Sequence, residues 1–124
     1  MHNELSAIDK RTIKELESDF DEAMMDVYRR ALNECDYKAS RFLHMLHEHR
    51  GLETARILLH APGVSEGYSA LWERKRLDLT VEAVIIDRKW ETLFTNAERN
   101  IARTRLAAYG YELPAPIERS KEAE

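Results

Sequence analysis

The first long segment of the chain carries apolar residues at intervals of three and four positions, which is the spacing of one face of an α-helix. Six residues form this stripe: Ile13, Leu16, Phe20, Ala23, Val27 and Ala31. The stripe is short for a coiled coil, so it predicts an amphipathic helix that packs on the core of its own chain. A homodimer formed through this helix stays open as an alternative.

The next segment predicts two shorter helices that meet at a glycine. Asp36 is a candidate N-cap for the first of them, over residues 37–50, and Gly51 can end it. The inner face of this helix would consist of Ala39, Phe42, Leu43 and Leu46. The second helix covers residues 52–59, where apolar residues are frequent, and the Ala-Pro-Gly sequence at 61–63 stops it.

A fourth helix is predicted after Ser65, which can cap it. Tyr68, Leu71 and Trp72 fall on one face at positions i, i+3 and i+4, so we expect all three side chains in the core. The charged residues of the segment lie largely off that stripe, on a solvated face. They are Glu66, Glu73, Arg74 and Lys75.

The segment LDLTVEAVII, residues 77–86, has two interpretations. Leu79, Val81 and Ala83 alternate with other residues as a strand would, and β-branched residues are frequent. A strand needs a partner, however, and the sequence offers no second alternating segment. We therefore predict a helix that is capped by Asp78 and buried near the centre of a bundle.

The last predicted helix begins with a capping box, in which Thr95 is followed three residues later by Glu98, and it ends at Gly110. Its apolar face would consist of Ala97, Ile101, Ala102, Leu106 and Tyr109. Residues 112–124 contain two prolines and no periodicity, which predicts a disordered tail. The chain as a whole predicts an all-α fold, a single-domain bundle of about five or six helices over residues 1–111.

Composition narrows the class of protein further. The 124 residues are 44% apolar, which suffices for one modest core, and no apolar run reaches the roughly 20 residues of a membrane-spanning helix. The N-terminus lacks the apolar stretch of a secretory signal. One cysteine, Cys35, cannot form an internal disulfide. These features predict a cytoplasmic protein without membrane contact.

Charge is spread unevenly along the chain, although the net charge is -4. Residues 1–36 hold 5 basic and 10 acidic side chains, whereas residues 37–111 hold 12 basic and 9 acidic ones. A dedicated nucleic-acid-binding domain usually has a clear basic excess. The mildly basic middle of the chain therefore keeps nucleic-acid binding open as an alternative without favouring it.

Six basic residues are candidates for a binding face: Arg74, Lys75, Arg76, Arg99, Arg103 and Arg105. Cations of this kind contact phosphates, and Tyr109 and Tyr111 could stack on bases. Glu73 and Glu98 lie among the basic residues, however, and a surface of mixed charge is ordinary for a helical bundle.

A metal site is a candidate on the predicted helix at 37–50. His44, His47 and Glu48 stand at positions i, i+3 and i+4, so they share one helical face and could hold zinc. A zinc site usually needs three or four ligands with supporting hydrogen bonds. Surface or interface histidines are the favoured explanation, and we expect no cofactor.

A nuclease is a further alternative. Asp78, followed by Asp87 and Lys89 after an apolar run, imitates the carboxylate pair and lysine of nucleases that depend on a divalent metal. That chemistry requires the carboxylates to converge on one cation from neighbouring strands. The helical prediction for residues 77–86 argues against such strands.

The region from Tyr37 to Tyr111 resembles a family of small bacterial proteins that has no established activity. The features in common are Leu-Trp-Glu at 71–73, Arg-Leu-Asp-Leu-Thr-Val-Glu-Ala at 76–83, Trp90 followed by Leu-Phe-Thr, and Ala-Arg-x-Arg-Leu before Tyr-Gly-Tyr. The resemblance implies a self-contained helical module linked with mobile elements or defence genes. It implies no catalytic residues.

These observations together predict a non-catalytic protein-interaction module whose partner is another protein, and the resemblance implies that it belongs to a bacterial or mobile-element system related to defence. A nucleic-acid-binding accessory protein that uses the basic residues is the first alternative. A nuclease that depends on a divalent metal is the second.

Overall fold

The computed structural model describes residues 2–113, and their side chains from Ile13 onward. All regular elements in this part of the chain are α-helices or 3-10 helices, which confirms the all-α prediction. The elements are α1 (His2–Cys35), α2 (Ser40–His60), α3 (Glu66–Glu73), the 3-10 segment η1 (Leu77–Leu79), α4 (Val81–Ile85), the 3-10 segment η2 (Arg88–Leu93) and α5 (Asn96–Ala108).

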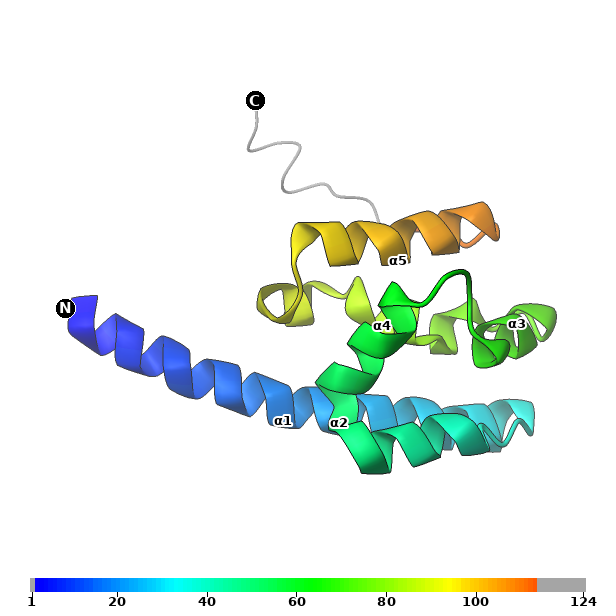
Figure 1. Cartoon of the computed structure of the whole chain (residues 1–124), viewed down its shortest axis with the longest axis horizontal. Coiled ribbons are helices and arrows are strands. Elements are labelled where there is room, and N and C mark those ends of the chain that lie inside the picture. The colour runs from blue at the N-terminus through cyan, green and yellow to red at the C-terminus, as the bar shows by residue number, and fades with distance from the viewer. Residues whose placement is uncertain (1, 114–124) are drawn as a thin grey trace.

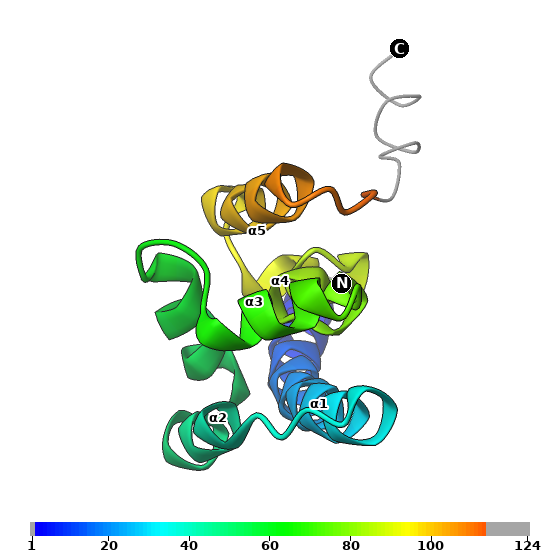
Figure 2. The ribbon, with the colours of Figure 1, turned by 90° about the vertical axis from the view of Figure 1, so that its right-hand side faces the viewer.

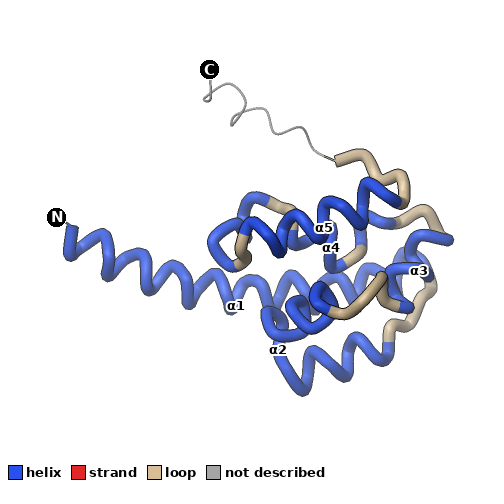
Figure 3. The backbone as a smooth tube through the Cα atoms, turned by 45° about the horizontal axis from the view of Figure 1, so that its top comes forward, coloured by secondary structure: helices blue, strands red, loops and turns tan. Residues whose placement is uncertain are grey.

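The helices form a bundle in which α1 and α5 lie on opposite sides (Figures 1 and 2). Between them lie α3, α4 and the two 3-10 segments, while α2 runs beside α1 and then turns toward α5. The N-terminal part of α1 projects beyond the other helices (Figure 3). The predicted homodimer through this helix stays a prediction, and Ile13 on it is 42% exposed.

Phe20 of α1 is the centre of the main core. Its side chain is fully buried, and its ring makes edge-to-face contacts with Trp90 and Phe94, at centroid distances of 5.3 and 5.4 Å. Met24, one turn later on α1, is also fully buried. The predicted stripe of α1 therefore packs on its own chain, where Phe20 joins it to η2 and to the residue that follows η2.

The two helical stretches predicted before and after residue 51 are present, joined at a sharp bend inside α2. The bend lies at Arg50, which has φ 67° and ψ -177°. Asp21 of α1 holds the bend. Its carboxylate accepts hydrogen bonds from the Gly51 backbone N–H at 2.7 Å and from the Arg50 guanidinium at 2.7 Å. A carboxylate on α1 thus caps the second stretch of α2.

Two predicted N-caps are wrong, and both are aspartates. Asp36 instead ends α1 in a left-handed conformation (φ 54°), with its N–H donated to the Leu32 carbonyl. Asp78 pairs with Arg76, and Thr80 caps α4 by accepting the Ala83 N–H at 3.2 Å. Aspartate suits helix starts and left-handed positions alike, so its presence alone does not place a boundary.

Three further predicted helix boundaries are confirmed, whereas the single helix predicted over residues 77–86 is divided into η1 and α4. Ser65 caps α3 by accepting the Tyr68 N–H, and Thr95 and Glu98 form the complete capping box of α5. Gly110 has φ 85° after α5, as a C-terminal glycine should. Lys75 takes the equivalent left-handed position after α3 without being glycine (φ 61°).

The predicted inner faces of α3 and α5 need correction. Tyr68 and Leu71 are buried, but Trp72 is 46% exposed and Tyr109 is 37% exposed. Ala97 is exposed as well. The Trp72 and Tyr109 rings meet edge to face at the surface instead of entering the core.

The first residues of the predicted tail lie in the part of the chain that the structure describes. Leu113 is partly buried against the main core, so packing extends beyond residue 111. The remainder of the predicted disordered tail, residues 114–124, lies outside the described residues.

Two helical glycines make a matched pair for a stability test. A Cβ on Gly51 would lie 2.8 Å from the Asp21 carboxylate and 3.1 Å from the Asp21 Cα, whereas a Cβ on Gly67 would meet nothing closer than 3.8 Å. Gly51→Ala should lower the free energy of unfolding by about 1–3 kcal/mol through overpacking. Gly67→Ala should raise it by about 0.5–1 kcal/mol by removing backbone freedom. Urea titration monitored by circular dichroism measures both, and equal effects would contradict the close α1–α2 contact.

Candidate functional site

A cavity of about 540 Å³ lies between the C-terminal half of α1, the start of α2, the start of α3 and the η1–α4 segment. Its apolar walls include Val27, Tyr28, Phe42 and Met45, which are all partly exposed. Four exposed polar residues stand at its mouth: Lys38, Ser40, Arg41 and Glu66. A dry void of this size would cost as much as the whole stability of a small domain, so the cavity must be open to solvent or filled.

A buried ion pair forms one end of the cavity. Glu82 of α4 lines the cavity and is 4% exposed, and its carboxylate accepts a hydrogen bond from the Arg105 guanidinium at 3.0 Å. Burial raises the pKa of Glu82, and Arg105 offsets part of that rise. The pair keeps this acid inside the bundle without an uncompensated charge.

Arg105 of α5 also closes the end of α2. Its guanidinium donates to the carbonyls of Leu58, Leu59 and Ala61, at 3.2, 3.0 and 2.8 Å. These are carbonyl groups at the C-terminal end of a helix, which have no intrahelical donor. The Tyr68 hydroxyl of α3 donates to the Arg105 backbone carbonyl at 2.9 Å, and burial raises the pKa of Tyr68 to about 12.

Trp72 and Tyr109 form an exposed aromatic patch next to this site. Their rings meet edge to face at 5.5 Å, and Tyr109 meets the buried Tyr68 ring in the same way at 5.1 Å. The aromatic patch therefore rests on a rigid support, because Tyr68 lines the cavity on one side and contacts the patch on the other.

Two of the six predicted basic residues lie inside the bundle. Arg99 is 5% exposed and donates to the carbonyls of Ile85 and Ile86 at the end of α4. Arg105 is partly buried and makes the contacts given above. Neither guanidinium is part of a solvent-exposed basic face, and Arg103 on the same helix is only partly exposed.

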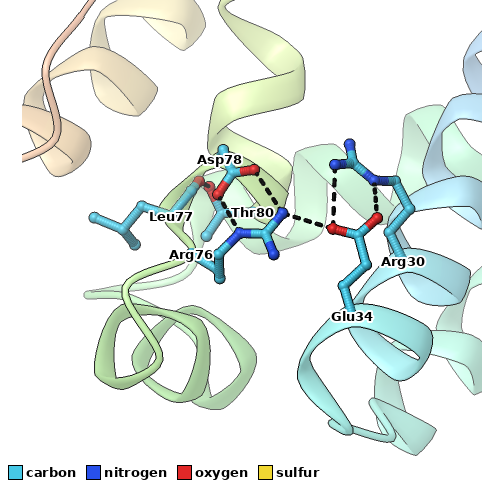
Figure 4. Close-up of polar contacts among 6 residues, drawn as sticks. All are labelled: Arg30, Glu34, Arg76, Leu77, Asp78 and Thr80. Carbon is cyan, nitrogen blue, oxygen red and sulfur yellow. Dashed lines mark hydrogen bonds and ion pairs between the residues drawn. The ribbon is translucent and has the colours of Figure 1, made fainter.

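Arg76 belongs to a charged network that joins η1 to the end of α1 (Figure 4). Its guanidinium binds Asp78 at 3.0 Å and Glu34 at 2.7 Å, and Glu34 also binds Arg30 at 2.8 Å. Hydrogen bonds from Arg30 and then from Arg76 lower the pKa of Glu34 to about 2. The same network lowers the pKa of Asp78, chiefly through Arg76.

Arg74 and Lys75, which precede this network, behave differently. Arg74 lies over the Tyr37 ring, 5.0 Å from its centroid, and donates to the Cys35 and Ala70 carbonyls. Lys75 is exposed. The structure thus does not gather the six predicted residues on one surface, although nucleic-acid binding itself stays a prediction.

The described residues, 13–113 for side chains, include no group of three or more side chains that could hold a metal ion. His44 and His49 each lie near Glu48, at 3.5 and 3.7 Å, but His47 does not complete a site with them. The carboxylates of the nuclease alternative are engaged elsewhere. Asp78 pairs with Arg76, and Asp87 caps η2 by accepting the Lys89 N–H.

The buried acids and the cavity were not predicted. Glu98 is 7% exposed and lies 3.2 Å from Arg56 and 3.0 Å from His60, both on α2. Burial acts to raise the pKa of Glu98, but hydrogen bonds from the Thr95 N–H and His60, together with Arg56, lower it overall. One sequence signal could have predicted the buried ion pair. Glu82 is a charged residue inside an apolar run, and such a residue is usually paired when it is buried.

Comparison of the chain with protein-family models, with curated proteins and with solved structures finds no match. Among the described residues, no helix is both long enough and apolar enough to cross a membrane. The resemblance drawn from the sequence therefore stays an expectation, and a function has to be argued from the site.

The Glu82–Arg105 pair gives a direct stability test. Arg105→Met should lower the free energy of unfolding by about 3–5 kcal/mol, because it leaves a buried carboxylate unpaired. Adding Glu82→Leu should recover part of this loss, since no charge is then buried. Chemical denaturation of both single variants and the double variant measures the coupling, and strictly additive effects would contradict the pair.

The network around Glu34 predicts a pH dependence of stability. A carboxyl with a lowered pKa stabilises the fold above its unfolded pKa of about 4.5, and this contribution is lost as the pH falls toward about 2. Glu34→Gln should therefore lower the urea midpoint at pH 7 and have progressively less effect from pH 4.5 to pH 2. An effect of equal size at both ends of this range would argue against the network.

Proposed function

We propose that the protein is a non-catalytic protein-interaction module and that the aromatic patch, Trp72 and Tyr109, is its main contact surface. The main observation that supports the proposal is the exposure of the Trp72 side chain. An indole that is 46% exposed is unusual in a chain whose other tryptophan, Trp90, is 4% exposed. Tryptophan and tyrosine on a rigid support are the residues that most often dominate binding between proteins.

The engagement of charged side chains within the chain supports the same reading. Glu82, Glu98, Arg99 and Arg105 hold helix ends and capping positions together, so their charges are used in folding. Within the side chains described, no buried nitrogen or oxygen atom lacks a hydrogen-bond partner. We place the protein in the cytoplasm, where one unpaired cysteine is ordinary.

Nucleic-acid binding is the second candidate function, and one observation favours it. Lys75 is exposed and follows Trp72 by three residues, so a cation and a stacking platform lie on the same short segment. Proteins that bind single strands combine these two groups. A salt-dependent affinity would distinguish this function, since phosphate contacts release counterions.

The test is a pull-down from the native host with lysates that are treated or untreated with nuclease. Trp72→Ala should weaken capture of a protein partner by about tenfold or more, as a binding hot spot would. It should change the free energy of unfolding by only about 1 kcal/mol, because the side chain is half exposed. Capture that nuclease treatment abolishes, and that weakens with salt and with Lys75→Gln, would instead establish the second candidate.

Ile13→Ala is the matched control for Trp72→Ala. Ile13 is similarly exposed, at 42%, but it lies on α1 about 30 Å along the helix axis from Glu34, near which α3 ends. Loss of capture with Ile13→Ala but not with Trp72→Ala would contradict the proposal. That result would point to the projecting part of α1.

A further inference from the structure

We propose that the cavity between α1, α2 and α3 binds an uncharged, largely apolar small molecule that carries one hydrogen-bond acceptor. The proposal goes beyond the interaction function, because neither Trp72 nor Tyr109 lines the cavity. Its volume of about 540 Å³ is that of a small-molecule site, for which roughly 300–1,000 Å³ is usual.

The walls determine the apolar character of the ligand. Val27, Phe42, Met45 and Leu58 line the cavity, and each is only partly buried by the described chain. Water against such walls finds few hydrogen-bond partners, so an apolar molecule gains by displacing it. The rings of Tyr28 and Phe42 come from different helices, which suits a flat aromatic or alicyclic skeleton.

The charges around the cavity indicate an uncharged ligand. Glu82 is neutralised by Arg105 at 3.0 Å, and Glu66 lies 4.0 Å from Arg41 at the mouth. An anion would meet these two carboxylates and a cation would meet Arg41 and Lys38. Either ion would have to lose its hydration in a cavity that offers no unpaired opposite charge inside.

One corner of the cavity supplies hydrogen-bond donors. Gly67 has no side chain there, and the position of its absent Cβ lies 3.8 Å from the Tyr37 hydroxyl and 3.9 Å from the Ser65 hydroxyl. Ser65 Oγ already accepts the Tyr68 N–H, which leaves its O–H as a donor. A carbonyl or ether oxygen of the ligand fits this corner.

Three naphthalenes of nearly equal shape test the proposal. 2-Acetylnaphthalene is neutral with one acceptor, 2-isopropenylnaphthalene lacks the acceptor, and 2-naphthoate carries a negative charge. The reporter is the ¹³C-labelled methyl of Met45, which lines the cavity, with the methyl of Met24, fully buried in the core, as the internal reference. The ketone should shift the Met45 signal saturably and leave Met24 unmoved. The carboxylate should bind at least about tenfold more weakly because it must be desolvated.

Gly67→Leu fills the donor corner and should weaken binding of the ketone by about tenfold or more, whereas Ala107→Leu on the exposed side of α5 should not change it. The ketone should bind more tightly than the isopropenyl compound, and Tyr37→Phe, which removes one donor, should narrow this difference in affinity. The proposal is overturned if none of the three compounds shifts Met45, if 2-naphthoate binds as tightly as the ketone, or if Gly67→Leu leaves the affinity unchanged. Trp72→Ala should leave ketone binding intact, which separates this site from the aromatic patch.

Discussion

Most of the bundle depends on the hydrogen bonds that the Arg105 guanidinium makes. It belongs to α5, closes the end of α2 through three carbonyls, and neutralises Glu82 of α4. The backbone carbonyl of the same residue accepts the Tyr68 hydroxyl of α3. Four helices therefore meet at one residue, and the low dielectric around it strengthens each bond while making an unpaired partner costly.

Helix α3 has one side toward Arg105 and the cavity and another toward the exposed aromatic patch. Tyr68 is held from within by Arg105, and Leu71 lies against the cavity. Trp72, the next residue, is 46% exposed and contacts the ring of Tyr109, which follows α5. One short helix thus contributes residues both to the cavity and to the exposed aromatic patch, and the two surfaces share no exposed residue of it.

Local patterns in the sequence predicted most of the helices. Periodicity identified α1, the two stretches of α2 and α5, and the caps at Ser65 and Thr95 follow from side-chain chemistry within four residues. The failures concern contacts between distant residues. Arg99 and Arg105 looked like surface cations because the carbonyls they bind lie 13 to 47 positions away in the chain. Trp72 looked like a core residue because its contact with Tyr109, a residue distant in the chain, is not visible in the local pattern.

The cavity and the bend in α2 also depend on distant parts of the chain. The residues that line the cavity come from five separate stretches of the chain, and apart from Glu82 none of them is unusual where it stands in the sequence. The bend requires Asp21 to lie opposite Gly51, 30 positions away. Gly51 predicted a helix boundary at this position. The reason for a glycine there is the close approach of α1, which the sequence alone does not show.

The position of Arg105 near the end of the chain has a consequence for synthesis on the ribosome. A nascent chain that has emerged as far as α4 already contains both partners of the Asp21 contact between α1 and α2, which lie entirely within its first half. At that stage the last carbonyls of α2 and the carboxyl of Glu82 still face water, because their donor has not been made. The contacts of Arg105 with α2, α3 and α4 can therefore form only after α5 has left the exit tunnel.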